Sequence, residues 1–244
     1  MFYKYETHFH TSEVSKCGRS TAVEMVRAHK KAGYTGVFVT DHFVNGNCTV
    51  PRHISWKEQM DLFMQGYELA HEEGKKIGLD VFFAWEYVNS PYGEDYLTYN
   101  LGYDFLIAHP KLYKLSFEEY SKVVRENGGY IIHAHPYRTA DYILYEPNPK
   151  LDLIDGVEVN NTTSGSPHNH NELAWELARA NPQLLRISGT DIHSTDIAGL
   201  GGVAFPYRIE NSQHFIDALR AGDGYLIIDG QITDMKGNIV DKAV

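Results

Sequence analysis

Cysteines and long apolar runs are both scarce in this chain. Cys17 and Cys48 are the only cysteines among 244 residues, and two thiols make no disulfide framework of the kind that small secreted domains use. The apolar runs Val81–Trp85 and Leu226–Ile228 fall far short of the roughly 20 residues that a membrane-spanning helix requires. The first residues also lack the basic and then apolar segments of a signal peptide. We therefore expect a cytoplasmic protein with no membrane association.

Basic side chains are also few. The sequence has 22 Lys and Arg against 32 Asp and Glu, a net charge of −10. Because phosphate contacts dominate affinity for nucleic acids, proteins that bind them usually present a basic surface. The charge therefore argues against an extensive nucleic-acid interface and leaves room for a small phosphorylated substrate. Carboxylates that hold cations would cancel part of the charge, and the 13 histidines direct attention to metal binding.

Short apolar runs alternate with amphipathic stretches along the chain, which is the pattern of βα units. The expected strands are Phe2–Thr7, Gly36–Thr40, Leu79–Trp85, Tyr130–His133, Gly156–Val159, Leu185–Ser188 and Tyr225–Ile228. Helices are expected after Thr21, Ser55 and Ser116, each followed three residues later by Glu in the S/T-x-x-E capping pattern, and over Asn171–Ala180. With 43% hydrophobic residues and no linker or repeat, the chain is expected to form one α/β domain over residues 1–244.

Polar, chemically capable residues follow almost every expected strand. In β/α barrels the carboxyl ends of the strands meet at the active site, so these side chains are expected to gather there. The segments are Asp41-His42, Glu86, His133-Ala134-His135, Asn160-Asn161 and Asp191-Ile192-His193.

Histidine pairs with the spacing H-x-H are the clearest metal signal. His8 and His10 end the first expected strand, where alternation points both imidazoles to the same face. His133 and His135 repeat the spacing. Each pair can arise by chance, but their combination with carboxylates at strand ends argues for a site. Zn, Fe and Mn all accept mixed histidine and carboxylate ligands. Four other histidines are interpreted as surface residues: His29, His53, His71 and His214.

The sequence resembles the polymerase and histidinol phosphatase (PHP) family of metal-dependent phosphoesterases. The matching motifs run in the family's order across nearly the whole chain: His8-Phe9-His10-Thr11, Thr40-Asp41-His42, Glu86, His135-Pro136 and Gly189-Thr190-Asp191-Ile192-His193. The resemblance implies a distorted (βα)7 TIM-like barrel with two or three divalent ions in a cleft, and hydrolysis of a phosphate ester.

The resemblance also implies which residues bind the ions. His8 and His10 would bind the first ion with Glu86 and Asp191. Glu86 would bridge to a second ion that also takes His135. His42 and His193 would bind a third ion.

Two positions depart from the family pattern. After H-x-H, where the family often has Asp or His, the local position reads Cys17-Gly18; Glu13 is the favoured ligand, and Cys17 is the alternative because thiolates bind zinc well. Where the family often has His after Glu86, Asp95 is favoured over His109. A carboxylate at that position would favour Mn or Fe over Zn.

Roles beyond metal binding can be assigned to a few further residues. Arg19 and Arg138 follow metal motifs closely and are candidates for phosphate contacts. Asp191 or His193 could shuttle a proton, and His168 could line the substrate pocket. His133 could support a ligand rather than bind an ion. The sequence does not indicate an oligomeric state.

Two rival interpretations remain. Amidohydrolases also carry H-x-H on a first strand and cleave C–N bonds, but they usually add a metal-bridging lysine, and no lysine stands at an expected strand end here. A non-catalytic PHP-like regulatory module is the second rival, against which the nearly complete ligand set argues.

Overall fold

The computed structural model describes residues 1–89, 92–143 and 145–240, and its strands form two sheets. The strands are β1 (Tyr3–Phe9), β2 (Gly36–Val39), β3 (Asp80–Phe83), β4 (Trp85–Asn89), β5 (Glu94–Tyr99), β6 (Tyr130–His133), β7 (Gly156–Asn161), β8 (Leu185–Gly189), β9 (Gly201–Phe205), β10 (Tyr225–Ile228) and β11 (Gln231–Thr233). The six-stranded sheet has the order β11-β10-β9-β1-β2-β3, and the five-stranded sheet has the order β4-β5-β6-β7-β8. Each sheet has a parallel set, β1 to β3 or β6 to β8, extended by antiparallel strands.

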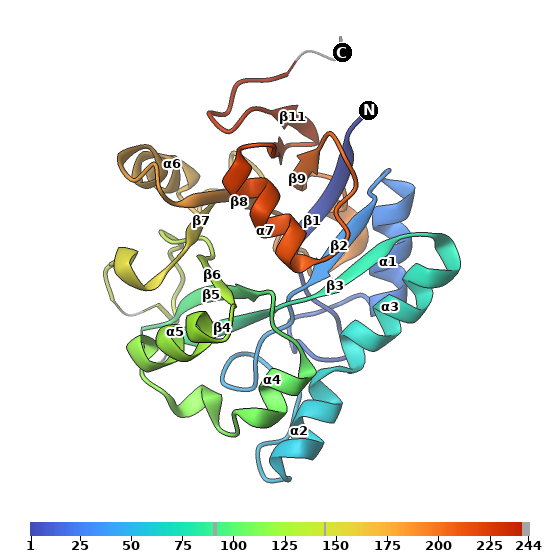
Figure 1. Ribbon diagram of the computed structural model, residues 1–244, viewed down its shortest axis with the longest axis vertical. Coiled ribbons are helices and arrows are strands. Elements are labelled where there is room, and N and C mark those ends of the chain that lie inside the picture. Colours follow the sequence, from blue (N-terminus) through green and yellow to red (C-terminus); the bar gives the residue numbers. More distant parts are fainter. Residues whose placement is uncertain (90–91, 144, 241–244) are drawn as a thin grey trace.

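Helices surround the strands (Figure 1). They are α1 (Ala22–Lys31), α2 (Trp56–Phe63), α3 (Gln65–Ile77), α4 (Tyr103–Ala108), α5 (Phe117–Glu126), α6 (Asn171–Ala180) and α7 (Ser212–Ala221), with short 3-10 helices at Leu112–Lys114, Leu151–Leu153 and Thr195–Ile197. The capping boxes predicted at Thr21, Ser55 and Ser116 are all present, since each hydroxyl accepts a hydrogen bond from the backbone of the Glu three residues on. In Figure 1, α1 and α3 lie on one side of the strands, and α5 and α6 lie on the other.

The expected distorted (βα)7 TIM-like barrel is wrong for the described residues, whose strands form two mixed sheets and no closed barrel. The two sheets meet at two seams that each carry an isolated bridge, Phe9 with Ile192 and His42 with Glu86, instead of a continuous ladder. The ladder is interrupted because antiparallel strands break the βα alternation. β9 lies antiparallel along β1, and β5 lies antiparallel between β4 and β6. Both bridges nevertheless bring ends of strands from the two sheets together.

Some strand boundaries also differ from expectation. The run expected as one strand, Leu79–Trp85, forms β3 and β4, with Ala84 between them. Glu86 therefore lies inside β4 rather than after a strand. β9 was not expected, because its opening residues Gly201 and Gly202 belong to a residue type that is depleted in strands.

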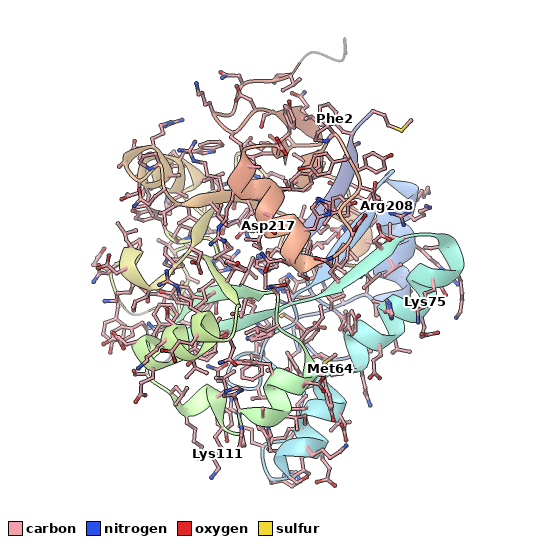
Figure 2. All side chains as sticks on the ribbon, in the orientation of Figure 1. Phe2, Met64, Lys75, Lys111, Arg208 and Asp217 are labelled. Atoms are coloured by element: carbon pink, nitrogen blue, oxygen red, sulfur yellow. The ribbon has the colours of Figure 1, made fainter. Side chains whose placement is uncertain are left out.

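Two apolar clusters support this arrangement. The larger one joins both sheets and α7, where the Phe38 ring lies 5.2 Å from Tyr99 and 4.6 Å from Phe215 between centroids. The smaller one lies where α1 and α3 cover the six-stranded sheet and includes Met25 and Val37. Charged side chains such as Lys75 lie at the periphery (Figure 2). No helix in the described part of the chain is long and apolar enough to span a membrane.

Candidate metal centre

The end of the first strand and the residue that follows it bring two imidazoles close together. His8 and His10 alternate with Phe9 along β1, so both lie on the same face. Both side chains are fully buried, and their Nε2 atoms lie 3.2 Å apart. Phe9 faces the other way and packs in the cluster under α1. The alternation that buries Phe9 thus brings the two histidines together.

Buried neighbours fix the hydrogens of both rings on Nδ1. His8 Nδ1 lies 3.2 Å from Glu158 Oε1, and a carboxylate can only accept. His10 Nδ1 lies 3.0 Å from Ser15 Oγ, whose own hydrogen goes to Asp41 Oδ1 at 2.7 Å. Each ring therefore donates through Nδ1 and presents its Nε2 lone pair to the same space. Two lone pairs this close repel one another unless a proton or a cation lies between them.

Two carboxylates close the space around these nitrogens. Asp191 Oδ1 lies 3.3 Å from His8 Nε2 and 3.1 Å from His10 Nε2. The two oxygens of Glu86 face different pairs of histidines. Its Oε1 lies 3.2 Å from His8 Nε2 and 3.3 Å from His135 Nε2. Its Oε2 lies 3.4 Å from His10 Nε2 and 2.7 Å from His42 Nδ1. A carboxylate placed in this way can bridge two ions.

These side chains fit divalent metal ions. Three groups have ligand atoms within 4.8 Å of one another: His10, His42 and His193; His8, His10 and Asp191; and His8, Glu86 and His135. Ligands around one ion with bonds of about 2.0–2.2 Å lie roughly 3–3.5 Å apart, close to the separations seen here. Glu86 Oε2 is also buried without a hydrogen-bond donor of good geometry, which is costly unless a cation compensates it.

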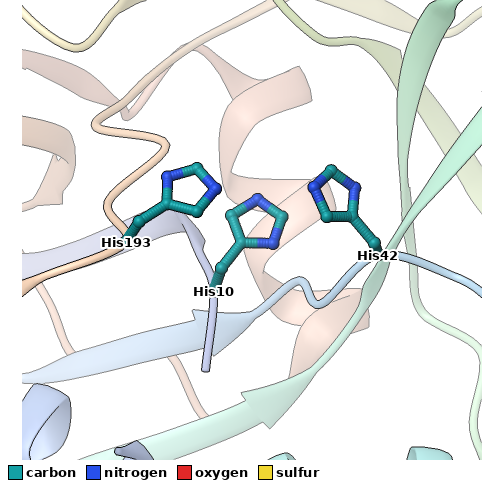
Figure 3. A group of neighbouring side chains, drawn as sticks. All are labelled: His10, His42 and His193. Carbon is teal, nitrogen blue, oxygen red and sulfur yellow. The ribbon is translucent and has the colours of Figure 1, made fainter. Parts of the chain in front are cut away.

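The first group gathers three rings from separate segments (Figure 3). His10 comes from the end of β1, His42 from the segment after β2, and His193 from the segment after β8. The ring centroid of His10 lies 4.4 Å from that of His42 and 4.5 Å from that of His193. His42 and His193 are the more exposed members and line a cleft of about 530 Å³. The outer part of the centre is therefore open to a substrate.

Cys17, rather than Glu13, lies beside these rings. Cys17 lines the same cleft as His42 and His193, and its thiol contacts both. The Glu13 carboxylate instead accepts hydrogen bonds from the backbone N–H of Ala22 at 3.0 and 3.2 Å, at the first turn of α1. Neither Glu13 nor Cys17 belongs to one of the three ligand groups, so the choice rests on which side chain lies beside the rings. Of the two candidates left open by the sequence, the geometry favours Cys17.

Asp95 lies at the centre, and His109 does not. The Asp95 carboxyl is buried, lines the cleft and lies 3.9 Å from His135 Nε2. His109 ends α4, and its Nδ1 lies 2.8 Å from the backbone oxygen of Phe105. His133 is buried against Tyr96, with ring centroids 4.4 Å apart, and is in none of the ligand groups. Asp95, like His109 and His133, belongs to none of the three ligand groups, but it lies beside His135 in the cleft.

The backbone is strained where two of the candidate ligands sit. Asp191 has φ 50° and His135 has φ 30°, in the left-handed region that non-glycine residues rarely adopt. The nearby Gly189 allows close packing, because a Cβ there would lie 2.6 Å from Glu158 Oε1 and 2.7 Å from His8 Cβ. Strain held by surrounding structure is typical of functional sites.

Opposing charges dominate the electrostatics. Burial lowers the pKa of His8, but neighbouring carboxylates, Asp191 foremost, outweigh this and hold it well above its ordinary value. Burial lowers the pKa of His10 to about 3, and the adjacent His42 adds to the effect. Burial would raise the pKa of Glu86, yet the surrounding histidines hold it well below its ordinary value. Without an ion, protons on imidazoles balance the carboxylates, so metal binding should displace protons.

Arg138 is the candidate phosphate ligand that reaches the centre. Its Nη2 donates to Asp191 Oδ2 at 2.5 Å and to Asn161 Oδ1 at 2.9 Å, while its Nε donates to Asn169 Oδ1 at 2.8 Å. Arg19 lies farther out, where its Nη2 reaches the Ser194 hydroxyl at 3.4 Å. His168 lies in a separate, wider hollow that Arg138 also borders.

The sequence interpretation missed the roles of several supporting residues. Glu158 orients His8, and its charge inside the buried strand β7 was the available signal. Asp41 binds the loop after β1 by accepting hydrogen bonds from the backbone and hydroxyl of Thr11, both at 2.7 Å. His29, interpreted as a surface residue, is fully buried, and its Nδ1 lies 2.8 Å from the Met25 carbonyl oxygen. Its place on the apolar face of α1 could have revealed this.

Comparison with known proteins gives the same fold. No family model and no curated protein matches the chain. Among solved structures, a two-domain Bacteroides vulgatus protein that contains a predicted PHP-like metal-dependent phosphoesterase has a TM-score of 0.63 at 16% identity, over 95% of this chain and 66% of that one. A candidate metal-dependent phosphoesterase of Bifidobacterium adolescentis has a TM-score of 0.51 at 17% identity, over 88% and 95% of the two chains. Endonuclease Q, in complex with a 27-mer duplex that has an abasic lesion at the active site, has a TM-score of 0.61 at 13% identity, over 91% and 57%.

The Endonuclease Q structure corrects the expectation about partners. The net charge of −10 argued for a small phosphorylated substrate and against an extensive nucleic-acid interface, yet the same fold holds duplex DNA in Endonuclease Q. The inference was wrong because net charge sums the whole chain, whereas a phosphate responds to the local field of the site that binds it.

This chain spans just under two thirds of the Bacteroides protein and little more than half of Endonuclease Q. The likeness therefore concerns only part of each of these two proteins. The chain has the fold of the PHP-like metal-dependent phosphoesterases, the family that its motifs predicted.

Proposed function

We propose that this protein is a metal-dependent phosphoesterase that works with two or three divalent ions. The observation that carries the proposal is the 3.2 Å approach of His8 Nε2 and His10 Nε2 between the carboxylates of Glu86 and Asp191. Such a cluster has no role in the packing of a core, where buried polar groups instead pair and are satisfied. The shared fold with PHP-like phosphoesterases supports the same activity.

The protein side chains divide the work of the reaction. Divalent ions in this centre would polarise the phosphoryl group and supply an activated water. Glu86 would bridge two ligand groups, because one of its oxygens faces His8 and His135 and the other faces His10 and His42. Arg138, held by Asp191 and two asparagines, would bind and orient a phosphate oxygen. His193, which lines the cleft, would bind the outer ion through one ring nitrogen and pass a proton to the leaving oxygen through the other, with Asp191 beside it.

The donor set indicates which metals to test. Glu86, Asp95 and Asp191 bring three carboxylates to the inner part of the centre, and oxygen ligands favour Mn or Fe. The outer part combines His10, His42 and His193 with the Cys17 thiol, and sulfur favours Zn. We propose Mn or Fe at the inner positions and Zn at the outer position.

A nucleic-acid phosphodiester is the proposed ester. The supporting observation is the nucleic acid at the active site of Endonuclease Q, a neighbour with the same fold. The open cleft beside His42 and His193 would admit a strand.

Elemental analysis and hydrolysis by conservative variants test this function. Freshly purified protein should contain bound metal. His10→Gln, Glu86→Gln and Asp191→Asn should each lower phosphodiester hydrolysis by at least about a hundredfold, the range seen when a catalytic electrostatic group is removed. His109→Gln is the matched control, because His109 lies outside the ligand groups.

Circular dichroism should show that all four variants fold. Metal-free protein as purified, or full activity in the three centre variants, would refute the function. Hydrolysis of amides or lactones in place of phosphate esters would favour the amidohydrolase alternative.

A further inference from the structure

Exposed aromatic side chains gather around the metal cleft. Within residues 1–89, 92–143 and 145–240, the aromatic side chains classed as exposed are Tyr92, Tyr142 and Tyr145, at 44%, 60% and 49%. The remaining Tyr, Phe and Trp residues of the described chain are buried or half-buried. Exposed rings are unfavourable in water and need no explanation when scattered, but their confinement to one place indicates a binding surface.

All three rings border hollows that meet at Arg138. Tyr142 lines the metal cleft together with His42 and Asp191, and it also lines the wider hollow beyond Arg138. Tyr92 and Tyr145 line a narrow hollow together with His135 and Arg138. Their rings meet edge to face with centroids 4.9 Å apart. Aromatic surface therefore borders the guanidinium that would hold the phosphate in each of these hollows.

We propose that Tyr142 and the Tyr92–Tyr145 pair are stacking surfaces for the bases that flank the scissile phosphate of a single-stranded nucleic acid. A phosphomonoester would offer one flat group, whereas a phosphodiester within a strand offers one on each side. Bases stack on tyrosine whatever their sequence, because every base has a π face. A paired duplex hides those faces between neighbouring bases, so the strand must be single or locally unpaired.

The lining of the cleft agrees with a short footprint. Among the described residues that line the metal cleft and the two hollows beside it, Arg138 is the only Lys or Arg, so few phosphate contacts along a strand are available there. Affinity must come from the metal centre, Arg138 and stacking. The inference rests on the proposed phosphoesterase function and adds to it the class of substrate and the residues that select it.

Two oligonucleotides of about eight nucleotides, within the usual footprint of single-strand binders, separate stacking from backbone binding. One is an oligothymidylate, and the other has the same length but only abasic sites; both carry phosphorothioates to slow cleavage. Isothermal titration calorimetry on the metal-loaded protein should show tighter binding of the oligothymidylate. Tyr142→Ala should shrink this preference about tenfold, or about 1.4 kcal/mol, and Tyr145→Ala should shrink it less.

Tyr142→Phe and Tyr142→Trp keep a ring and should keep the preference, which guards against a folding defect in the alanine variant. Leu69→Ala, at another exposed apolar residue on α3, is the matched control and should also keep it. Equal affinity of the wild type for the two oligonucleotides, equal weakening of both by Tyr142→Ala, or tighter binding of a blunt duplex would overturn the inference. Failure of the metal-loaded wild type to cleave an unmodified strand of either kind would instead refute the phosphoesterase function.

Discussion

His8 and Glu158 form a buried pair in which Glu158 Oε1 lies 3.2 Å from His8 Nδ1. This ring nitrogen faces away from the candidate ligands that surround His8 Nε2. This contact fixes the Nδ1 hydrogen and turns the Nε2 lone pair toward Glu86 and Asp191. Carboxylates that support a ligating histidine raise its basicity and hold its orientation. Glu158 also accepts hydrogen bonds from Asn161 and from the backbone of His135. It therefore organises two of the expected ligands at once.

Glu158→Gln should weaken metal binding by about 10–100-fold, the usual effect of removing such a supporting group. The amide keeps the size of the side chain but removes its charge. Competition with a chromogenic chelator measures the dissociation constant. Glu118→Gln, an exposed position on α5, should leave the constant unchanged. An unchanged constant for Glu158→Gln would show that His8 needs no such support.

Asp95→Asn should stabilise the metal-free protein at neutral pH. Burial and the adjacent charge of Glu86 raise the pKa of Asp95 well above its ordinary value. Between the ordinary and the raised pKa, the folded state holds a proton that the unfolded chain has released, so the free energy of unfolding falls as pH rises. The neutral amide does not titrate, so Asp95→Asn avoids this fall in the free energy of unfolding. Each 1 kcal/mol gained in the free energy of unfolding raises Tm by about 2–4 °C.

Thermal melts in a chelator at pH 5 and pH 8 check this prediction, because the gap between variant and wild type should widen at the higher pH. With metal present the order should reverse, since a bound ion stabilises the folded state and Asp95→Asn removes a candidate ligand. A variant that melts below the wild type in chelator at pH 8 would contradict the assignment of Asp95 as a buried, uncompensated carboxyl.

Gly189→Ala should damage the centre without altering any ligand. The added Cβ would press on the Glu158 carboxylate and on His8 at distances below 3 Å, and overpacking of this kind typically costs about 1–3 kcal/mol. We expect a lower Tm together with weaker metal binding. Gly165→Ala is the matched control, because a Cβ at Gly165 would meet nothing within 4 Å. Normal metal affinity in Gly189→Ala would show that β8 can shift away from His8.

The clustering of the candidate ligands could be predicted from sequence because strand alternation and motif order act locally. His8 and His10 must share a face of any strand, and Asp191 and His193 follow a short apolar run. The division of the strands into two mixed sheets could not be predicted in the same way. Whether β1 takes a parallel or an antiparallel neighbour depends on β9, whose glycines gave little strand signal.

The choice between Glu13 and Cys17 could not be made from the sequence. Glu13 stood nearer to His10 along the chain than Cys17 does, but the loop places Glu13 on the first turn of α1 and Cys17 beside His42 and His193. Loop geometry decides this choice, and sequence distance carries no information about it.

Residues that support a ligand were harder to find than the candidate ligands. Glu158 could be noticed only as a charge inside an apolar strand, because its partner His8 is 150 residues away.

Cys17 should react as a thiolate near neutral pH, unlike Cys48. Burial would raise the pKa of the Cys17 thiol, but contacts with His193 and His42 outweigh it and lower the pKa to about 6. Burial raises the pKa of Cys48 to about 11. In metal-free protein, alkylation by iodoacetamide should therefore modify Cys17 alone, with a rate that rises through pH 6 instead of the ordinary value of about 8.5.

Zinc should suppress this alkylation if Cys17 completes the outer group of ligands. Cys17→Ser should abolish labelling, and Cys48→Ser should leave its rate and pH profile unchanged. Zinc affinity should fall in Cys17→Ser and stay constant in Glu13→Gln, because the Glu13 carboxylate caps α1. Labelling at an undiminished rate under saturating zinc, together with a loss of zinc affinity in Glu13→Gln, would reverse the assignment and return Glu13 to the metal centre.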